Sequence, residues 1–321
     1  MRAVTLHEHG GPEALAVEEV DRPEPNPHEL LIEVEAAGVN PVDTYFRDGS
    51  YEPVGLPFTP GVDFAGTVVE TGEHAGDFDP GDAVFGVGIG NAQYQGAYAE
   101  FAVVPASRTV QRPPGVAADE AGAAGVVACT AWRALLDHAD LGPAESCLVH
   151  GGSGGVGHAA VQLAAAVHAN VLATAAPEYH EAVADLGADV VLDYGRDDLA
   201  EAVLEASGGG VDVVLDHRLE EYLQFDADVA ATGARVVGIG ENRPDPGFTN
   251  DGAARSKDVN YQFMSLFNTP DLRVPLRVVG DLMARGALSI EIARRYDLEE
   301  ADEAQRAVME ESFLGKLVIE P

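Results

Sequence analysis

The sequence predicts an α/β protein that combines a doubly wound parallel sheet with a smaller, β-rich part. Three observations support this class. Apolar strands alternate with helical stretches through the second half of the chain. The first third consists of short β-branched segments separated by Gly and Pro. The 321 residues are enough for two domains of ~100 to 200 residues each, and 46% apolar residues supply the core.

Two segments of the N-terminal third are typical of β-sheet. "LLIEVEAAGVN" at 30–40 alternates apolar and polar residues, and "FAGTVVETGEHAGDFDPGDAVFGV" at 64–87 is rich in β-branched residues and turn formers. Together they predict a partly open β-barrel or sandwich. A helical stretch follows over 118–141.

The doubly wound sheet is expected between residues 147 and 267. Six apolar strands with helical connections are predicted at 147–151, 170–175, 190–194, 212–217, 234–240 and 259–267. The amphipathic segment 275–289 predicts a helix ending at Gly286. Strand, helix and strand then follow over 291–320 and are expected to return to the first domain. We therefore predict a catalytic domain of residues 1–123 and 272–321 and a dinucleotide-binding domain of residues 124–271.

The charge balance excludes several classes of partner. Asp and Glu number 54 against 19 Lys and Arg, a net charge of -35, and the lysines are Lys257 and Lys316 alone. Such a surface repels phosphate backbones and acidic lipids, so neither nucleic acid nor a membrane is an expected partner. At molar salt the screening length falls to ~3 Å and self-repulsion is largely removed. We expect a halophilic protein from a high-salt cytoplasm; an acidic protein of ordinary salt is the alternative.

The cysteine pattern, the first ten residues and the one long uncharged run indicate a cytoplasmic protein. Cys129 and Cys147 lack a C-x-x-C pattern or a third partner, so neither a zinc knuckle nor a disulfide framework is expected. "MRAVTLHEHG" lacks the basic and apolar regions of a signal peptide. The uncharged run 146–177 is long enough to span a bilayer, but its central glycines favour a buried strand, turn and helix.

The segment "VHGGSGGVGHAAVQLA" at 149–164 carries the main binding motif. Gly152, Gly154 and Gly157 fit G-x-G-x-x-G directly after an apolar strand and directly before a helix. In this context the glycines permit a tight turn, a close approach to a pyrophosphate and close helix packing, and the helix amides bind the anion. We therefore expect residues 152–157 to bind a dinucleotide, with Ser153, Gly155 and Val156 included. The overlapping G-x-S-x-G at 151–155 is not taken as a hydrolase motif, because Gly-Val-Gly continues it.

The end of the second strand of this domain favours NADPH. An NAD site usually has an acidic residue ~20 residues after the glycines, which binds the ribose 2'-hydroxyl. Here 174–176 read Thr, Ala, Ala, so no carboxylate repels a 2'-phosphate. His180, Tyr194 and Arg196 are the candidate contacts for that phosphate, although Glu178 lies among them.

Five segments in a fixed order, the glycine turn among them, point to a family. With "AAGVNPVDTYFRDGSY", "LPFTPGVDFAGTV", "GDAVFG", "GAYAEFAVVP" and "VHGGSGGVG", the chain resembles the zinc-independent quinone oxidoreductases, the zeta-crystallin-like branch of the medium-chain dehydrogenase/reductase superfamily. The resemblance runs through "GARVVGIG", "NYQFMSLF" and "GKLVI". It implies a Rossmann dinucleotide-binding domain and a GroES-like catalytic domain, with NADPH bound in the cleft between them.

The resemblance also implies that no metal is bound. Zinc-dependent members would have Cys near Asn40 and G-H-E near residue 61, where this chain has Gly61, Val62 and Asp63. Val62 cannot bind a metal, and the lobe with four structural cysteines is absent. Hydrogen bonds are then expected to polarise the substrate carbonyl.

Site residues follow from the family pattern. It implies a substrate-side wall with catalytic functions made of Asn40, Asp43, Tyr45 and Tyr51; Asn and Tyr donate hydrogen bonds, and either tyrosine is a candidate proton donor. It implies cofactor contacts at Thr130, Gly240, Phe267, Asn268 and Lys316. Many relatives have Asp-Ser/Thr-Val-Gly-Gly where this chain has "DHRLEEYLQF", and the roles of His217 and Arg218 are left open.

Three functions remain as hypotheses. The first is an NADPH-dependent, zinc-independent reductase of quinones; one-electron and hydride transfer are not distinguished. The second keeps the cofactor but reduces α,β-unsaturated aldehydes or ketones. The third is a non-catalytic nucleotide-binding protein with a structural or RNA-binding use, against which the net charge argues. The resemblance implies a homodimer, and the strand at 259–267, expected at a sheet edge, could pair with its counterpart in the second copy.

Overall fold

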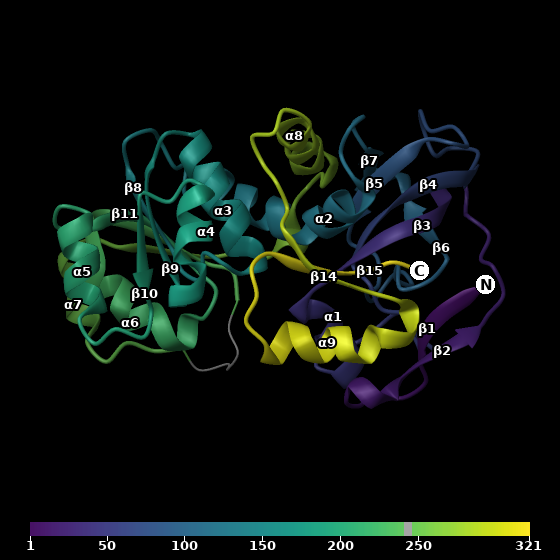
Figure 1. Ribbon diagram of the computed structural model, residues 1–321, viewed down its shortest axis with the longest axis horizontal. Helices are drawn as coiled ribbons and strands as arrows, with labels where there is room; N and C mark the ends of the chain where they lie inside the picture. Colours follow the sequence, from purple (N-terminus) through teal and green to yellow (C-terminus); the bar gives the residue numbers. More distant parts are fainter. Residues whose placement is uncertain (241–245) are drawn as a thin grey trace. The chain divides into compact units, whose positions relative to one another are not determined.

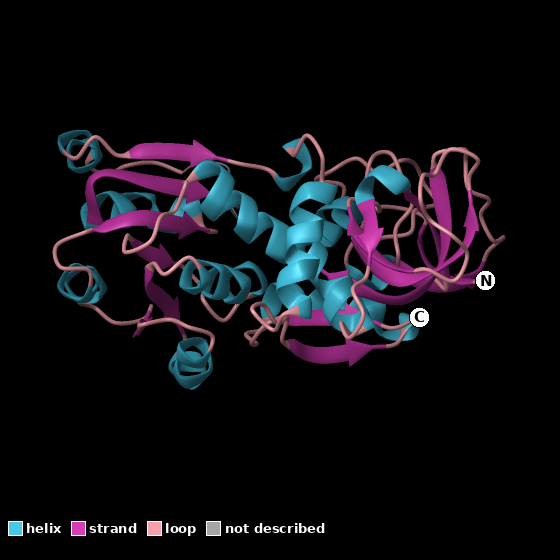
Figure 2. Ribbon diagram, turned by 90° about the horizontal axis from the view of Figure 1, so that it is seen from above, coloured by secondary structure: helices cyan, strands magenta, loops and turns pink. Residues whose placement is uncertain are grey.

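The computed structural model describes residues 1–240 and 246–321. The chain forms two compact units, which we call unit 1 (Met1–Cys129 with Thr269–Pro321) and unit 2 (Thr130–Asn268). Both chain termini lie in unit 1, because the last 53 residues return to it (Figures 1 and 2). In the described part of the chain no helix has both the length and the apolar character needed to cross a membrane.

Unit 1 is built on a seven-stranded sheet in which only the β14–β15 pair is parallel. Its order is β14 (Ile292–Tyr296), β15 (Lys316–Ile319), β3 (Glu29–Val39), β4 (Asp63–Thr71), β5 (Ala83–Val87), β7 (Thr109–Gln111), and β6 (Phe101–Pro105) also pairs with β3. A separate antiparallel pair is formed by β1 (Arg2–Leu6) and β2 (Leu15–Glu19). The predicted β-rich domain is confirmed, and residues 291–320 join it as expected.

Four helices belong wholly or mainly to unit 1: α1 (Pro41–Asp48), α2 (Ala118–Trp132), α8 (Arg273–Ala284) and α9 (Ala301–Glu310). Helix α2 approaches the sheet closely, because a Cβ on Gly125 would lie 2.6 Å from Asp63 Oδ1. Large side chains such as Phe64, Tyr98 and Ile32 fill the core of the unit. This close approach brings the backbone of α2 within hydrogen-bonding distance of Asp63.

Unit 2 has the predicted six-stranded parallel sheet. Its order is β10 (Val190–Asp193), β9 (Asn170–Ala175), β8 (Ser146–Val149), β11 (Val211–Asp216), β12 (Ala230–Gly238), β13 (Asn260–Phe263). The order reverses between β8 and β11, which is the topological switch point of a doubly wound sheet, where ligands bind at the carboxyl ends of the strands. Strand β13 lies at the edge, as predicted, but it ends at Phe263 and a 3-10 turn occupies 266–268.

Helices cover both faces of this sheet. They are α3 (Gly155–Ala166), α4 (His180–Asp185), α5 (Leu199–Ala206), α6 (Leu219–Val229) and α7 (Asp251–Ser256). Helices α3 and α4 pack on β8, β9 and β10, whereas α5, α6 and α7 form a second group, seen in Figure 1 on the other side of the strands. Shorter turns complete the chain: η1 (Pro12–Ala14), η2 (Ala106–Arg108), η3 (Arg133–His138, a π-helix), η4 (Pro177–Tyr179), η5 (Leu266–Asn268) and η6 (Leu298–Glu300).

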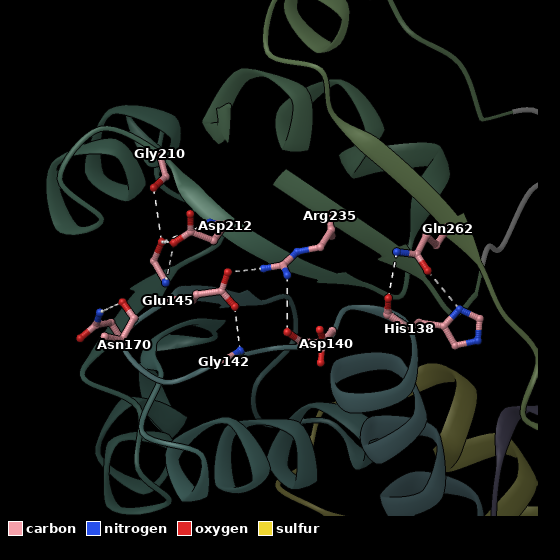
Figure 3. Close-up of polar contacts among 11 residues, drawn as sticks. His138, Asp140, Gly142, Glu145, Asn170, Gly210, Asp212, Arg235 and Gln262 are labelled. Atoms are coloured by element: carbon pink, nitrogen blue, oxygen red, sulfur yellow. Dashed lines mark hydrogen bonds and ion pairs between the residues drawn. The ribbon is translucent and has the colours of Figure 1, made fainter. Parts of the chain in front are cut away.

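A polar network fastens the amino ends of the unit 2 strands (Figure 3). The backbone N–H and hydroxyl of Ser146 both donate to Asp212 Oδ2 at 2.8 Å. Arg235 donates to Glu145 Oε1 at 2.6 Å, and Gly142 N donates to the other oxygen of Glu145 at 2.7 Å. Both carboxylates are therefore paired at the amino ends of the strands, and the carboxyl ends at the opposite side of the sheet are left for a ligand.

Candidate active site

The glycine turn of unit 2 lies between β8 and α3, and two of its glycines are sterically required. Gly151 has φ +66°, a left-handed conformation that side chains rarely adopt. A Cβ on Gly157 would lie 2.0 Å from the carbonyl oxygen of Gly151, so α3 can pack on the turn only without a side chain there. By contrast, the nearest atom that a Cβ on Gly154 would meet among the described residues, its chain neighbours aside, is the Gly151 oxygen at 3.4 Å. The turn is thus tightly packed at Gly157 and open at Gly154.

The turn is held by β9 and presents uncapped amides. Gly151 N donates to Thr174 Oγ1 at 3.0 Å, and Gly152 N donates to Thr174 O at 2.7 Å. Helix α3 follows an extended Gly154, and no side chain in the described part of the chain caps its first turn. Because the first N–H groups of a helix have no partner within it, the amides of Gly155, Val156 and Gly157 form an anion-binding end. Ser153 lies half-buried within the same turn.

The residues expected to bind a 2'-phosphate lie at the neighbouring strand ends. In the parallel β9–β10 pair Ala175 is opposite Asp193, so His180 and Tyr194 follow strands that end at the same edge. His180 Nε2 is 3.2 Å from Ala175 O, and Tyr194 is half-exposed. Arg196 forms a forked ion pair with Asp198, at 2.7 and 2.9 Å. A phosphate at Arg196 would have to compete with this carboxylate.

In unit 1, Asn40 and Asp43 form the start of α1 and are buried. The two residues make a capping box, in which Asn40 N donates to Asp43 Oδ2 at 2.8 Å. Asp43 also accepts from Val62 N at 3.0 Å and from the Tyr98 hydroxyl at 3.1 Å. Burial outweighs these three donors and raises the pKa of Asp43 to about 6.

Asn40 connects Lys316 to Asp63 in the same network. Lys316 Nζ donates at 2.6 Å both to Val39 O and to Asn40 Oδ1, and Asn40 Nδ2 donates to Asp63 Oδ2 at 2.9 Å. Burial raises the pKa of Asp63 to about 7 and lowers that of Lys316. The contacts of Lys316 thus lie within unit 1. The Asn40 side chain was predicted to donate to a substrate oxygen, but its amide oxygen and its amide nitrogen are both engaged in this network.

Tyr45 and Tyr51 lie nearer the surface. Their rings meet edge to face at 5.5 Å, and Tyr51 N donates to Tyr45 O at 2.8 Å. Tyr51 is 51% exposed, and Val54 and Leu56 on the same loop are each 43% exposed. The loop therefore presents an apolar surface with a phenol hydroxyl beside it, a combination that suits a flat, oxygen-bearing ring.

The remaining predicted contacts are placed as follows. Thr130 is buried near the end of α2. Gly240 follows β12, and its carbonyl oxygen accepts from Leu219 N at 3.3 Å. Phe267 and Asn268 lie on η5, and Phe267 is 42% exposed. These residues are not drawn together by any described contact.

Sequence reasoning missed three residues that build these sites. Asp63 and Tyr98 complete the network around Asn40 and Asp43, and the signal was a carboxylate within an apolar run, "PGVDFAG". Gly151, rather than Gly152, has the left-handed turn conformation. In the described residues, no three His, Cys, Asp or Glu side chains are grouped so as to hold a metal ion.

Family models match both parts of the chain. The alcohol dehydrogenase GroES-like domain matches residues 26–114, and the zinc-binding dehydrogenase model matches residues 186–319. The chain is 36% identical over 327 residues to a quinone oxidoreductase of Lama guanicoe, with 99% of this chain and 97% of that protein covered. It is 33% identical to a human quinone oxidoreductase, with the same coverage.

Solved structures agree with this assignment. The Escherichia coli quinone oxidoreductase complexed with NADPH aligns with a TM-score of 0.91 at 26% identity, covering 100% of both chains. A structure described as an NAD-dependent alcohol dehydrogenase aligns with a TM-score of 0.93 at 28% identity, also over 100% of both chains. The fold class expected from the sequence is confirmed, and the chain belongs to the quinone oxidoreductases of the medium-chain dehydrogenase/reductase superfamily.

Proposed function

We propose that this protein is an NADPH-dependent quinone oxidoreductase that works without zinc. One observation supports this most strongly: the uncapped amides of α3 and the open space at Gly154 occur in a chain 36% identical along its length to a quinone oxidoreductase. The cradle suits a pyrophosphate, because it offers N–H donors and has no side chain in the way. When bound, the cofactor would supply the reducing electrons.

The chain's own residues would bind the cofactor and orient the quinone. The amides of Gly155, Val156 and Gly157 would hold the pyrophosphate. The surface of Tyr51, Val54 and Leu56 would exclude water from one face of the quinone ring, and the Tyr51 hydroxyl would donate to the oxygen that gains negative charge. Lys316 and Asp63 would hold the start of α1, and therefore this loop, in place.

We propose NADPH rather than NADH because of the residues at the carboxyl end of β9. Thr174, Ala175 and Ala176 offer no carboxylate to repel a 2'-phosphate, and Thr174 is engaged in the glycine turn. His180 and Arg196 would bind that phosphate. The test is fluorescence titration with NADPH and NADH in molar KCl, on the wild type and on His180→Ala and Arg196→Ala. Equal affinity of the wild type for both cofactors would refute the phosphate assignment.

An enone reductase remains the second candidate, because an apolar surface with one hydroxyl donor also suits an α,β-unsaturated carbonyl. Rates of NADPH oxidation with benzoquinone, naphthoquinone and an alkenal, all in molar KCl, distinguish the two. A protein that binds NADPH but reduces none of them would favour the non-catalytic alternative.

Two further properties are proposed. A homodimer would form by pairing of β13, which lies at the sheet edge and exposes Phe263 by 65%. Adaptation to high salt would explain the net charge of -35. Light scattering across a KCl series tests both, and a monomer at every concentration would refute the dimer.

A further inference from the structure

A group of buried ionisable side chains lies beside the glycine turn. His150 follows β8, Asp216 ends β11 and Asp226 lies on α6. All three are at most 2% exposed. His150 Nε2 is 2.9 Å from Asp226 Oδ1, and the imidazole stacks on Tyr222 with ring centres 4.1 Å apart and an angle of 4°.

Two carboxyl oxygens of this group have no donor. Among the described residues, no N–H or hydroxyl group donates to Asp216 Oδ2 or Asp226 Oδ2, yet the two fully buried side chains lie close enough for each to shift the pKa of the other. Two ionised carboxylates only accept hydrogen bonds and repel each other, whereas one proton between them satisfies both. By contrast, the carboxylates of Asp212 and Glu145, at the amino ends of the strands in Figure 3, receive donors from the protein.

We infer that Asp216 and Asp226 share one proton, and that Asp226, acting through His150, is a positioning residue for the glycine turn. His150 N donates to Leu215 O at 3.1 Å, and the next residue is Gly151, where the turn begins. A Cβ on Gly151 would lie 2.8 Å from His217 Cε1, so the turn fits closely against the segment that follows β11. The proton is independent of the proposed function, whereas its effect on cofactor binding rests on that function.

Burial sets the protonation of the group. It raises the pKa of Asp216 to about 7 and that of Asp226 well above its usual range. It lowers the pKa of His150 to about 4, so this imidazole is neutral at neutral pH. Neutral His150 then donates from Nε2 to Asp226. Loss of the shared proton would place two carboxylates in contact and push α6 away from β11.

Other charged and titratable groups lie around the pair, some acting on it directly and some on His217, Tyr222 or Tyr261 beside it. They are Arg218, Glu220, Glu221, Tyr222 and Asp228 on or before α6, Tyr261 on β13, Tyr194 after β10, and Lys257, whose Nζ donates to Ala227 O and Asp228 O at the end of α6. The backbone of Arg218 also contacts the side chain of Asp216, since Arg218 N donates to Asp216 Oδ1 at 2.7 Å. A single substitution at Asp226 leaves all of these in place.

The matched variants are Asp226→Asn and Asp228→Asn. The amide of Asp226→Asn donates to Asp216 and accepts from His150, as protonated Asp226 does, but it cannot titrate. Asp228→Asn removes the same charge from an exposed position of the same helix. NADPH affinity is measured by fluorescence in molar KCl across the neutral and alkaline range. In the wild type and Asp228→Asn, the dissociation constant should rise by up to about tenfold per pH unit above the titration of the pair, and in Asp226→Asn it should not.

Infrared spectroscopy tests the proton without the cofactor. A protonated carboxylic acid has a carbonyl band that a carboxylate lacks, so the wild-type minus Asp226→Asn difference spectrum at neutral pH should contain that band. Its absence overturns the inference, and so does a pH step that persists in Asp226→Asn. If no cofactor binds at any pH, the proposed function fails while the spectrum still decides the proton. Asp216→Asn, examined in the same way, provides the result if Asp226→Asn does not fold.

Discussion

Two alanine substitutions in the glycine turn should have separable effects. In Gly157→Ala the new Cβ would meet a backbone oxygen at 2.0 Å, which no side-chain rotation can relieve. Overpacking of this kind costs about 3 kcal/mol, and Ala gains about 1 kcal/mol over Gly within a helix. We therefore expect a net loss of about 2 kcal/mol in the free energy of unfolding, together with loss of cofactor binding.

Gly154→Ala is the matched control. Among the described residues other than its chain neighbours, its Cβ would meet nothing closer than 3.4 Å, and the extended backbone of Gly154 is one that Ala adopts readily. Because Gly154 is the N-cap of α3 and Ala is a poorer cap than Gly, stability should fall by about 0.5 to 1 kcal/mol, less than in Gly157→Ala. The methyl group would nevertheless occupy the space through which the pyrophosphate approaches the amides, so the dissociation constant for NADPH should rise at least about tenfold, or about 1.4 kcal/mol.

Urea unfolding followed by circular dichroism, and NADPH titration by fluorescence, measure the two effects in molar KCl. The reasoning would be refuted if both variants lost stability equally, or if Gly154→Ala bound NADPH as tightly as the wild type.

Three other predictions concern unit 1. Lys316→Met should destabilise the unit by about 3 to 5 kcal/mol in urea unfolding, because it leaves buried carboxylates without their cation. The control Lys257→Met removes a lysine from the end of a surface helix and should cost at most about 1 kcal/mol. Equal losses in the two variants would contradict the burial argument. Tyr51→Phe should lower kcat/KM for benzoquinone by about tenfold to a hundredfold with an unchanged melting temperature, whereas an unchanged kcat/KM would exclude the hydroxyl as a donor. The raised pKa values of Asp43 (about 6) and Asp63 (about 7) mean that the folded protein holds protons which the unfolded chain has released; stability should therefore fall as pH rises from about 4 to about 7, and a rise over that interval in urea unfolding would contradict the assignment.

The fold could be predicted because its signals are local. Alternating apolar strands and helices, with the glycines at the first turn, predicted the six-stranded parallel sheet and its edge strand, and both are observed. The return of residues 291–320 to unit 1 was also expected, and β15 pairs with β3 there.

The buried networks could not be predicted in the same way, because their partners are distant in sequence. Asp63 and Lys316 meet Asn40 across 23 and 276 positions. His150 and Asp226 are 76 positions apart, and Asp226 belongs to no motif. The ion pair of Arg196 with Asp198 is local but depends on side-chain geometry, and it changes how a 2'-phosphate site would have to work.

Steady-state reduction of benzoquinone tests the central claim most directly. Purified protein in molar KCl is given NADPH or NADH, with benzoquinone, naphthoquinone or an alkenal, and loss of the reduced cofactor's absorbance is followed before and after dialysis against a zinc chelator. We expect the highest kcat/KM with NADPH and a quinone, unchanged by the chelator. Activity confined to the alkenal, a preference for NADH, or activity lost to the chelator and restored by zinc would contradict the proposed function.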